Sequence, residues 1–274
     1  MPAVTIAVTL AKKAEIMNKL FLISGPCVIE NDETPFHIAR TVKSMCDELG
    51  IDFIFKGSYR KANRTREDSF TGIGDERALQ IIYSIGKEFQ VKTLTDVHES
   101  QEVAMVSEFV DILQIPAFLC RQTELLHAAG HSGKIVNIKK GQFISPEAMK
   151  YPVEKVMSTG NKNVWICERG FTFGYDDLIV DATVIPRLKK HNVPVVLDCT
   201  HSLQAPNQSS GITGGNPEFI ETLALVAAAT GADGLFIETH PSPSTALSDG
   251  ATMLQLDSLY SILQKVIRIR ESLS

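Results

Sequence analysis

The chain has 274 residues, of which 44% are hydrophobic and 22% charged, so it can bury a large core as one (β/α) barrel or as two small domains. Its net charge of -5 excludes a global basic field that would hold nucleic acid or an anionic membrane surface. Its five cysteines have no CxxC spacing, which argues against a disulfide framework and for a reducing cytosol. No apolar run approaches the roughly 20 residues of a membrane helix. We therefore expect a cytoplasmic protein with no nucleic-acid or membrane partner.

Residues 1–19 are expected to form an N-terminal extension. An apolar stretch lies there without a preceding basic region or a clear cleavage site, so the pattern does not predict a signal peptide. Val4, Ile6, Val8 and Leu10 alternate with other residues, which favours a short strand or β hairpin. Met17 could equally be a natural start.

From residue 20 onward, short apolar runs alternate with segments of helical periodicity. The predicted strands are residues 20–24, 52–56, 92–96, 111–115, 134–139, 164–169, 194–200 and 234–240. The predicted helices lie within residues 36–49, 76–89, 100–109, 122–130, 178–192, 219–231 and 255–272. The strands are continuously apolar rather than alternating, which is typical of parallel strands covered by helices on both faces.

Eight such units in about 250 residues predict a (β/α)8 TIM barrel, with residues 20–274 as a single catalytic domain. A doubly wound open sheet is the alternative. It is weakened because no GxGxxG follows the first strand, and because polar residues stand at the C-terminal ends of nearly all eight strands.

Metal-ligand types of side chain follow three of the predicted strands. Cys27 follows the first, His201 follows the seventh, Glu238 lies at the end of the eighth, and Asp249 lies in the next loop. These strands are neighbours in a closed barrel, so their ends could meet on one divalent cation. The mixture suits iron(II), zinc, manganese or cobalt better than magnesium or calcium. A cysteine after a strand is more often a small buried hydrophobe, however, and a histidine with two acids could bind substrate hydroxyls without metal.

Cations gather at other strand ends. They are Lys56, Arg60, Lys61, Arg64 and Arg66 around and after the second strand, Lys139 and Lys140 after the fifth, and Arg169 after the sixth. Such a cluster in an acidic protein favours binding of phosphates or carboxylates. A solvated face is the usual alternative and is expected for Arg60 or Lys140. Lys56, Lys139 and Arg169 continue apolar strands into the mouth, which favours ligand contact.

Polar side chains that could hold sugar hydroxyls also follow the strands: Asn63, Asp96, His98, Gln114, Asp198 and Gln204. His98 and His240 are each as consistent with a structural role as with a functional one.

Longer motifs carry a resemblance to a known family. They occur in order as GPCVIE, FKGSYRKANRT, TDVHE, LQIPAFLCRQTELL, NIKKGQFISPEAM, CERGFTFGYDDL, DCTHSLQAP and GLFIETHPSPSTALSDGATML. Together they resemble 3-deoxy-D-manno-octulosonate 8-phosphate synthase over nearly all of the chain from residue 20. The resemblance implies a homotetrameric (β/α)8 barrel, a transferase that condenses phosphoenolpyruvate with D-arabinose 5-phosphate and water and releases phosphate, in lipopolysaccharide precursor biosynthesis.

The resemblance also implies roles for individual residues. Cysteine in the first-strand turn marks the metal-dependent class of the family, with Cys27, His201, Glu238 and Asp249 as ligands of the divalent cation. The positions that bind phosphoenolpyruvate match Lys56, Lys61, Lys139, Arg169 and His201. Those for arabinose 5-phosphate match Asn63, Arg64 and Thr65, with Ser58, Asp96 and Gln114 lining the pocket. Catalysis would fall to Lys61, Lys139, Arg169, His201 and Asp249.

Two other functions stay open. The related 3-deoxy-D-arabino-heptulosonate 7-phosphate synthases use erythrose 4-phosphate and share the barrel and the GPC turn. They typically read KPRT after the second strand, where this chain reads KANRT. A non-catalytic barrel that binds sugar phosphates as a sensor or scaffold is the other alternative, although every matched catalytic position has the family's residue type.

Overall fold

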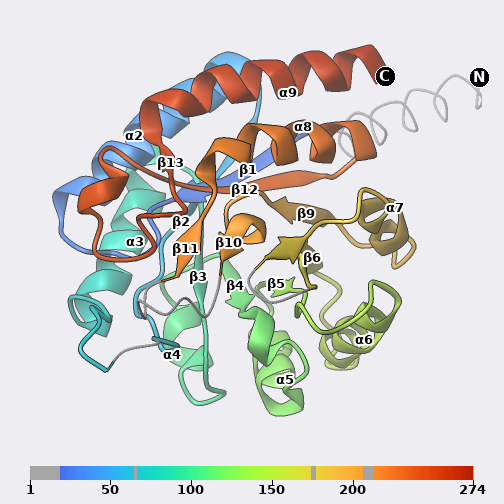
Figure 1. The fold of residues 1–274 in the computed structure, drawn as a ribbon. Helices are drawn as coiled ribbons and strands as arrows, with labels where there is room; N and C mark the ends of the chain where they lie inside the picture. The colour runs from blue at the N-terminus through green and yellow to red at the C-terminus, as the bar shows by residue number, and fades with distance from the viewer. Residues whose placement is uncertain (1–18, 65–66, 174–176, 206–212, 274) are drawn as a thin grey trace, which may run out of the picture.

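The computed structural model describes residues 19–64, 67–173, 177–205 and 213–273 (Figure 1). The expected N-terminal extension therefore lies outside the described residues, apart from Lys19. So does Thr65, one of the positions matched to sugar phosphate binding. Within the described part of the chain, no helix is both long and apolar enough to cross a membrane.

Eight parallel strands close into a barrel, which confirms the predicted fold class. Each strand pairs with the next along the chain, and the last pairs with the first, with Phe21 opposite Gly234. The strands are β1 (Phe21–Gly25), β2 (Asp52–Lys56), β3 (Lys92–Asp96), β4 (Ile112–Ile115), β5 (Ile135–Lys139), β6 (Val164–Glu168), β9 (Val195–Asp198) and β12 (Gly234–His240). All eight predicted strands exist, within two residues of the predicted bounds at either end.

Helices surround the barrel (Figure 1). They are α2 (Glu33–Leu49), α3 (Asp75–Phe89), α4 (Val103–Ser107), α5 (Thr123–His131), α6 (Lys150–Met157), α7 (Val184–Lys189), α8 (Ile220–Thr230) and α9 (Leu259–Leu273). The closing helix α9 packs beside α8 and α2, which completes the ring across the junction of β12 and β1.

Two apolar layers follow from the alternation of side chains along each strand. On β1, Leu22 packs in the layer between strands and helices, whereas its neighbour Ile23 packs inside the barrel, and both are fully buried. The inner layer is made of Ile23, Ile54, Leu94, Ile112, Cys167, Val196 and Phe236. Burial on both faces explains why the strands are continuously apolar in the sequence.

Short elements decorate the loops. The two-residue strands pair as β7 (Phe171–Thr172) with β8 (Leu178–Ile179) and β10 (Gln204–Ala205) with β11 (Gly214–Gly215), and β13 (Leu254–Gln255) pairs with β12. The 3-10 turns are η1 (Ala117–Leu119), η2 (Glu147–Met149), η3 (His201–Leu203), η4 (Pro217–Phe219), η5 (Pro243–Thr245) and η6 (Leu256–Ser258).

The helix predictions need two corrections. Helix α6 was not predicted, because it is short and its third residue is Pro152, which the first turn of a helix tolerates. The segment 178–192 was predicted as one helix, but it begins with strand β8, and α7 starts only at Val184. Asp181 accepts the backbone N–H and the hydroxyl of Thr183, and these bonds favour a turn immediately before that helix.

Candidate active site

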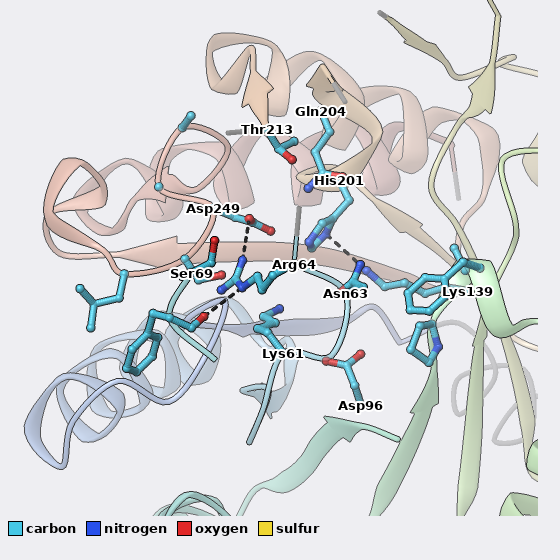
Figure 2. Close-up of a pocket in the computed structure, with 18 of the residues that line it drawn as sticks. Lys61, Asn63, Arg64, Ser69, Asp96, Lys139, His201, Gln204, Thr213 and Asp249 are labelled. Atoms are coloured by element: carbon cyan, nitrogen blue, oxygen red, sulfur yellow. Dashed lines mark hydrogen bonds and ion pairs between the residues drawn. The ribbon is translucent and has the colours of Figure 1, made fainter. Parts of the chain in front are cut away.

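A cavity of about 630 Å³ opens at the C-terminal ends of the barrel strands. It is lined by side chains from loops that lie far apart in the sequence, and Figure 2 shows them around it. They include Lys61, Asn63, Arg64, Asp96, His98, Lys139, Arg169, His201, Gln204 and Asp249. The cavity therefore gathers most of the cationic and polar residues that the sequence singled out.

The turn after β1 needs glycine at its first position. A Cβ added to Gly25 would lie 1.9 Å from the carbonyl oxygen of Lys56, so β1 and β2 approach too closely there for any side chain. Two residues later, Cys27 is almost fully buried, and its Sγ lies 2.9 Å from Ser248 Oγ and 3.5 Å from Asp249 Oδ2. Burial, with the nearby carboxylates of Asp249 and Glu238, raises the pKa of the Cys27 thiol to about 12.

Asp249 has an unusual backbone. Its φ is 46°, in the left-handed region that aspartate adopts more readily than most residues. The left-handed backbone of Asp249 turns the chain within the loop after β12. The Asp249 carboxylate lies there beside the turn that carries Cys27. The other carboxylate oxygen, Oδ1, lies 3.5 Å from Arg64 Nη1.

Glu238, on β12, is fully buried and is paired on one side only. Its Oε1 lies 2.5 Å from Lys56 Nζ, which also donates to the carbonyl oxygen of Cys27 at 2.9 Å. Its Oε2 has no hydrogen-bond partner and lies 3.5 Å from His201 Nε2. Burial opposes ionisation of Glu238, but the charges of Lys56, Lys61 and Lys139 favour it and lower the pKa of this carboxyl to about 2.

Asp198, at the end of β9, orients two of the predicted catalytic residues. Its Oδ2 lies 2.8 Å from His201 Nδ1 and 2.5 Å from Lys139 Nζ. Its Oδ1 accepts the backbone N–H groups of Thr200 and His201. Asp198 is fully buried, and both of its carboxylate oxygens are hydrogen-bonded within the protein. Sequence reasoning missed its orienting role; the DCTH spacing was the available signal.

The four expected metal ligands form two close pairs, Cys27 with Asp249 and His201 with Glu238. Three observations fit a divalent cation: the sulfur, nitrogen and oxygen donors, the unpartnered Oε2 of Glu238, and the carboxylate on His201 Nδ1, an arrangement typical of metal-binding histidines. Among the described residues, however, no group of three or more His, Cys, Asp or Glu side chains is arranged to hold a metal ion.

Asp96 faces the cavity from the end of β3. Ser58 donates to its Oδ2 and Gln114 donates to its Oδ1 at 2.6 Å, while Asn137 donates to Gln114 at 2.8 Å. Burial would raise the pKa of Asp96, but the nearby charges of Lys56 and Lys61 outweigh it and hold this pKa well below its usual range. Asp96 is therefore a fixed anion.

Three positions expected to contact substrate are not among the residues that line the cavity. Lys56, Ser58 and Gln114 are each at most 1% exposed. Lys56 pairs with Glu238, and the other two side chains bond Asp96. Lys56 is the last residue of β2, Ser58 follows that strand, and Gln114 lies in β4.

Arg169 and Arg64 approach the cavity from opposite loops. Arg169 Nη2 donates to Gln204 Oε1 at 2.5 Å and to the carbonyl oxygen of His201 at 3.2 Å, and its burial lowers the pKa of the guanidinium. Arg64 Nε donates to the carbonyl oxygen of Phe70 at 2.9 Å, and its buried Nη2 has no hydrogen-bond partner. Both side chains keep donors that an anion could use.

Lys140 is not on a solvated face, contrary to expectation. It is fully buried, 3.5 Å from Glu168 Oε2, and it donates to the carbonyl oxygen of Gly141 at 3.1 Å. Alternation along β5 directs Lys139 into the barrel and Lys140 outward, where the aromatic ring of Phe171 lies beneath the ammonium. Arg60, the other residue expected on a solvated face, is about one-third exposed and pairs with Glu102.

The amino-acid sequence matches a known protein family and several known proteins over most of its length. Residues 11–274 match the DAHP synthetase I family. A relative from Koribacter versatilis is 46% identical over 259 residues, which cover 93% of each chain. One from a Synechococcus strain is 46% identical over 93% of this chain and 90% of its own, and one from Bartonella tribocorum is 47% identical over 90% and 89%. All three are named 2-dehydro-3-deoxyphosphooctonate aldolase.

Proposed function

Because the chain belongs to the DAHP synthetase I family, we propose that it has the activity for which its relatives are named, that of a 2-dehydro-3-deoxyphosphooctonate aldolase. It is a transferase that condenses phosphoenolpyruvate with D-arabinose 5-phosphate and water. The products are 3-deoxy-D-manno-octulosonate 8-phosphate and phosphate. The observation that carries this function is the cavity, in which an acidic chain gathers four cationic side chains, those of Lys61, Arg64, Lys139 and Arg169.

Two phosphorylated substrates need cations at two places. In our proposal Lys61, Lys139, Arg169 and His201 hold the phosphate and carboxylate of phosphoenolpyruvate, with Lys56 beneath them. The phosphate of the sugar lies against Asn63, Arg64 and Thr65. The unpartnered Nη2 of Arg64 and the cationic end of Lys61 support this arrangement. Asp96, with Ser58 and Gln114 behind it, is an acceptor for sugar hydroxyls.

The chemistry follows from how charge develops. The C3 carbon of phosphoenolpyruvate, electron-rich as an enol ether, attacks the aldehyde of arabinose 5-phosphate and forms a C–C bond. Water then adds at C2, and the C–O bond to phosphate breaks. Positive charge develops at C2 and negative charge on the aldehyde oxygen, so fixed charges around both atoms provide most of the catalysis. Lys139 and Arg169 are held in place for this by Asp198 and Gln204.

A divalent cation, namely iron(II), zinc, manganese or cobalt, is part of the proposal, with Cys27, His201, Glu238 and Asp249 as its ligands. When bound, it would polarise or orient the aldehyde or activate water. Support comes from the donor types, from the orphaned Glu238 Oε2 and from the Asp198 carboxylate on His201. The thiol of Cys27 must lose its proton to become a ligand.

We further propose a cytoplasmic homotetramer. The five cysteines are all free and buried, which suits a reducing compartment. Large aromatic side chains on loops near the cavity are exposed, among them Phe118, Phe143 and Phe173, and a subunit interface would cover such groups. The molar mass measured by light scattering tests the assembly.

The decisive experiment measures consumption of phosphoenolpyruvate by the purified protein with added divalent metal. One sample contains arabinose 5-phosphate and the other erythrose 4-phosphate. Loss only with arabinose 5-phosphate is expected. Loss with erythrose 4-phosphate would instead identify the heptulosonate synthase, and no loss in either sample would favour a sugar-phosphate sensor.

A further inference from the structure

One carboxylate outside the cavity links two of the loops that line it. Glu102 lies just before α4 and is not among the lining residues. Its Oε2 accepts hydrogen bonds from the hydroxyl of Tyr59 and from Arg60 Nη2, the latter at 2.8 Å. Both partners belong to the loop after β2, and Lys61 directly follows Arg60.

The second oxygen of the same carboxylate holds the loop after β3. Glu102 Oε1 accepts the backbone N–H groups of His98 and Glu99, each at 2.6 Å. His98 lines the cavity, and Asp96 lies two residues before it. Figure 2 shows Lys61 and Asp96 among the side chains around the cavity; Lys61 lies in the loop after β2, and Asp96 is the last residue of β3.

Local helix capping explains only half of these bonds. A glutamate early in a helix often reaches back to backbone N–H groups a few residues earlier, as Oε1 does here. Capping does not require the bonds of Oε2, which join Glu102 to residues more than 40 positions away in the sequence. The Glu102 side chain is 9% exposed and Tyr59 is fully buried, so water competes weakly for the bond between them, whereas Arg60 is about one-third exposed.

The position of the loop after β2 determines where three of the residues that line the cavity lie. After Tyr59 and Arg60, the described chain continues through Lys61, Asn63 and Arg64, which line the cavity. The backbone N–H of Lys61 bonds the carbonyl oxygen of Thr71, so the loop is also held from its far side. Loss of the bonds at Tyr59 and Arg60 would loosen the segment that carries Asn63 and Arg64, whereas Lys61 would keep its bond to Thr71.

We propose that Glu102 is a positioning residue for the sugar phosphate: by joining the loops after β2 and β3, it sets the placement of Asn63 and Arg64 relative to Asp96. Lys61, which the proposed function assigns to phosphoenolpyruvate, is also held by its backbone bond to Thr71. The inference rests on the proposed function, because it names the half of the site that the loop serves. Glu102 touches no reacting atom and acts only through the residues that it holds.

The variant Glu102→Gln distinguishes the hydrogen bonds accepted by Oε1 from those accepted by Oε2. The amide keeps one oxygen for the backbone N–H groups of His98 and Glu99. Its NH2 group cannot accept a hydrogen bond from Tyr59 or Arg60. Glu99→Gln is the matched control, because it makes the same charge change on an exposed side chain of the same turn.

Steady-state kinetics and hydrogen–deuterium exchange test the inference together. In Glu102→Gln we expect KM for arabinose 5-phosphate to rise by about tenfold or more, the effect of losing hydrogen bonds to a charged group. We expect kcat and KM for phosphoenolpyruvate to change by less than about threefold. Exchange at the backbone amides of residues 59–64 should become faster, whereas Glu99→Gln should match the parent protein in every measurement.

The inference is overturned if Glu102→Gln matches Glu99→Gln, or if its melting temperature falls while KM for arabinose 5-phosphate stays unchanged, since capping alone would then explain Glu102. A different result would show that the proposed activity, rather than the role of Glu102, is wrong. The parent protein itself would not consume phosphoenolpyruvate with arabinose 5-phosphate. The exchange comparison needs no substrate and would still decide whether Glu102 holds the two loops.

Discussion

His201 Nδ1 lies 2.8 Å from Asp198 Oδ2, and the opposite nitrogen of the same ring, Nε2, faces Glu238 Oε2 at 3.5 Å. A carboxylate on one ring nitrogen fixes the tautomer in which the other nitrogen keeps a free lone pair. Lys139 Nζ shares the same oxygen of Asp198. One buried carboxylate therefore orients the imidazole of His201 and holds the ammonium of Lys139.

We expect Asp198→Asn to lower the affinity for added zinc about 10–100-fold, the usual effect of removing an outer partner of a metal-binding histidine. The amide can still accept from His201, but it cannot balance the charge of Lys139. Competition with a chromophoric chelator measures the affinity. Asp52→Asn, on an exposed residue at the opposite end of the barrel, is the control and should bind zinc like the parent. Equal affinities in both variants would count against the orienting role.

Removal of the metal should abolish activity, and Cys27→Ala should lose both metal and most activity, because the sulfur donor is gone. The protein is stripped with a chelator, its metal content is measured, and phosphoenolpyruvate consumption is followed before and after metal is restored. Full activity in the stripped protein would contradict the metal-dependent class. The resemblance to the synthase family also implies a metal-free class, which has asparagine at the position of Cys27. Cys27→Asn should therefore retain part of the activity without metal; if it is as inert as Cys27→Ala, the surrounding residues decide the class.

Lys140→Met should destabilise the fold by about 3–5 kcal/mol, because it leaves Glu168 charged, buried and unpaired. Burial raises the pKa of Glu168, and the charge of Lys140 opposes that shift. Without Lys140 this pKa rises further, so the folded variant takes up a proton and its loss of stability should be smaller at pH 5 than at pH 8. The free energy of unfolding in urea at both pH values measures this.

Two further variants test whether the buried charge of Glu168 causes the loss of stability in Lys140→Met. Adding Glu168→Gln to Lys140→Met removes the buried charge and should recover most of the lost stability. Lys150→Met breaks only an exposed ion pair with Glu154 and should change stability little. Lys140→Met could instead lower the free energy of unfolding by the same amount at both pH values. In that case lost packing, rather than the uncompensated carboxylate, is the cause.

Gly25→Ala should destabilise the barrel by about 1–3 kcal/mol or more, since the new methyl group would overlap the carbonyl oxygen of Lys56 and force β1 and β2 apart. Displacement of Lys56 and the Cys27 turn should also reduce activity. Thermal unfolding and phosphoenolpyruvate consumption test both effects.

Gly50→Ala is the control. At Gly50 an added methyl group meets no atom within 4 Å, and only the left-handed backbone of this residue opposes the substitution, so Gly50→Ala should keep full activity. Equal activity in the two variants would rule out the steric requirement at Gly25.

The barrel, and the end of it at which the cavity lies, could be predicted from the order of the residues alone. Eight apolar runs with polar residues at their C-terminal ends predicted parallel strands and the position of the site, because burial on both faces leaves a strong local pattern. Short or irregular elements escaped prediction. Helix α6 and strand β8 have too few residues for a clear period, and tertiary pairing rather than propensity forms them.

The contacts of the individual site residues could not be predicted in the same way. The sequence could place Lys139 and Lys140 at one strand end, but neighbouring residues on a strand face opposite sides, so one enters the cavity and the other is buried against Glu168. Likewise, the links from Asp198 to His201 and from Glu102 to Tyr59 depend on which loops the closed barrel brings together. Strand patterns follow from local burial, whereas such contacts depend on distances between distant segments, which no local pattern encodes.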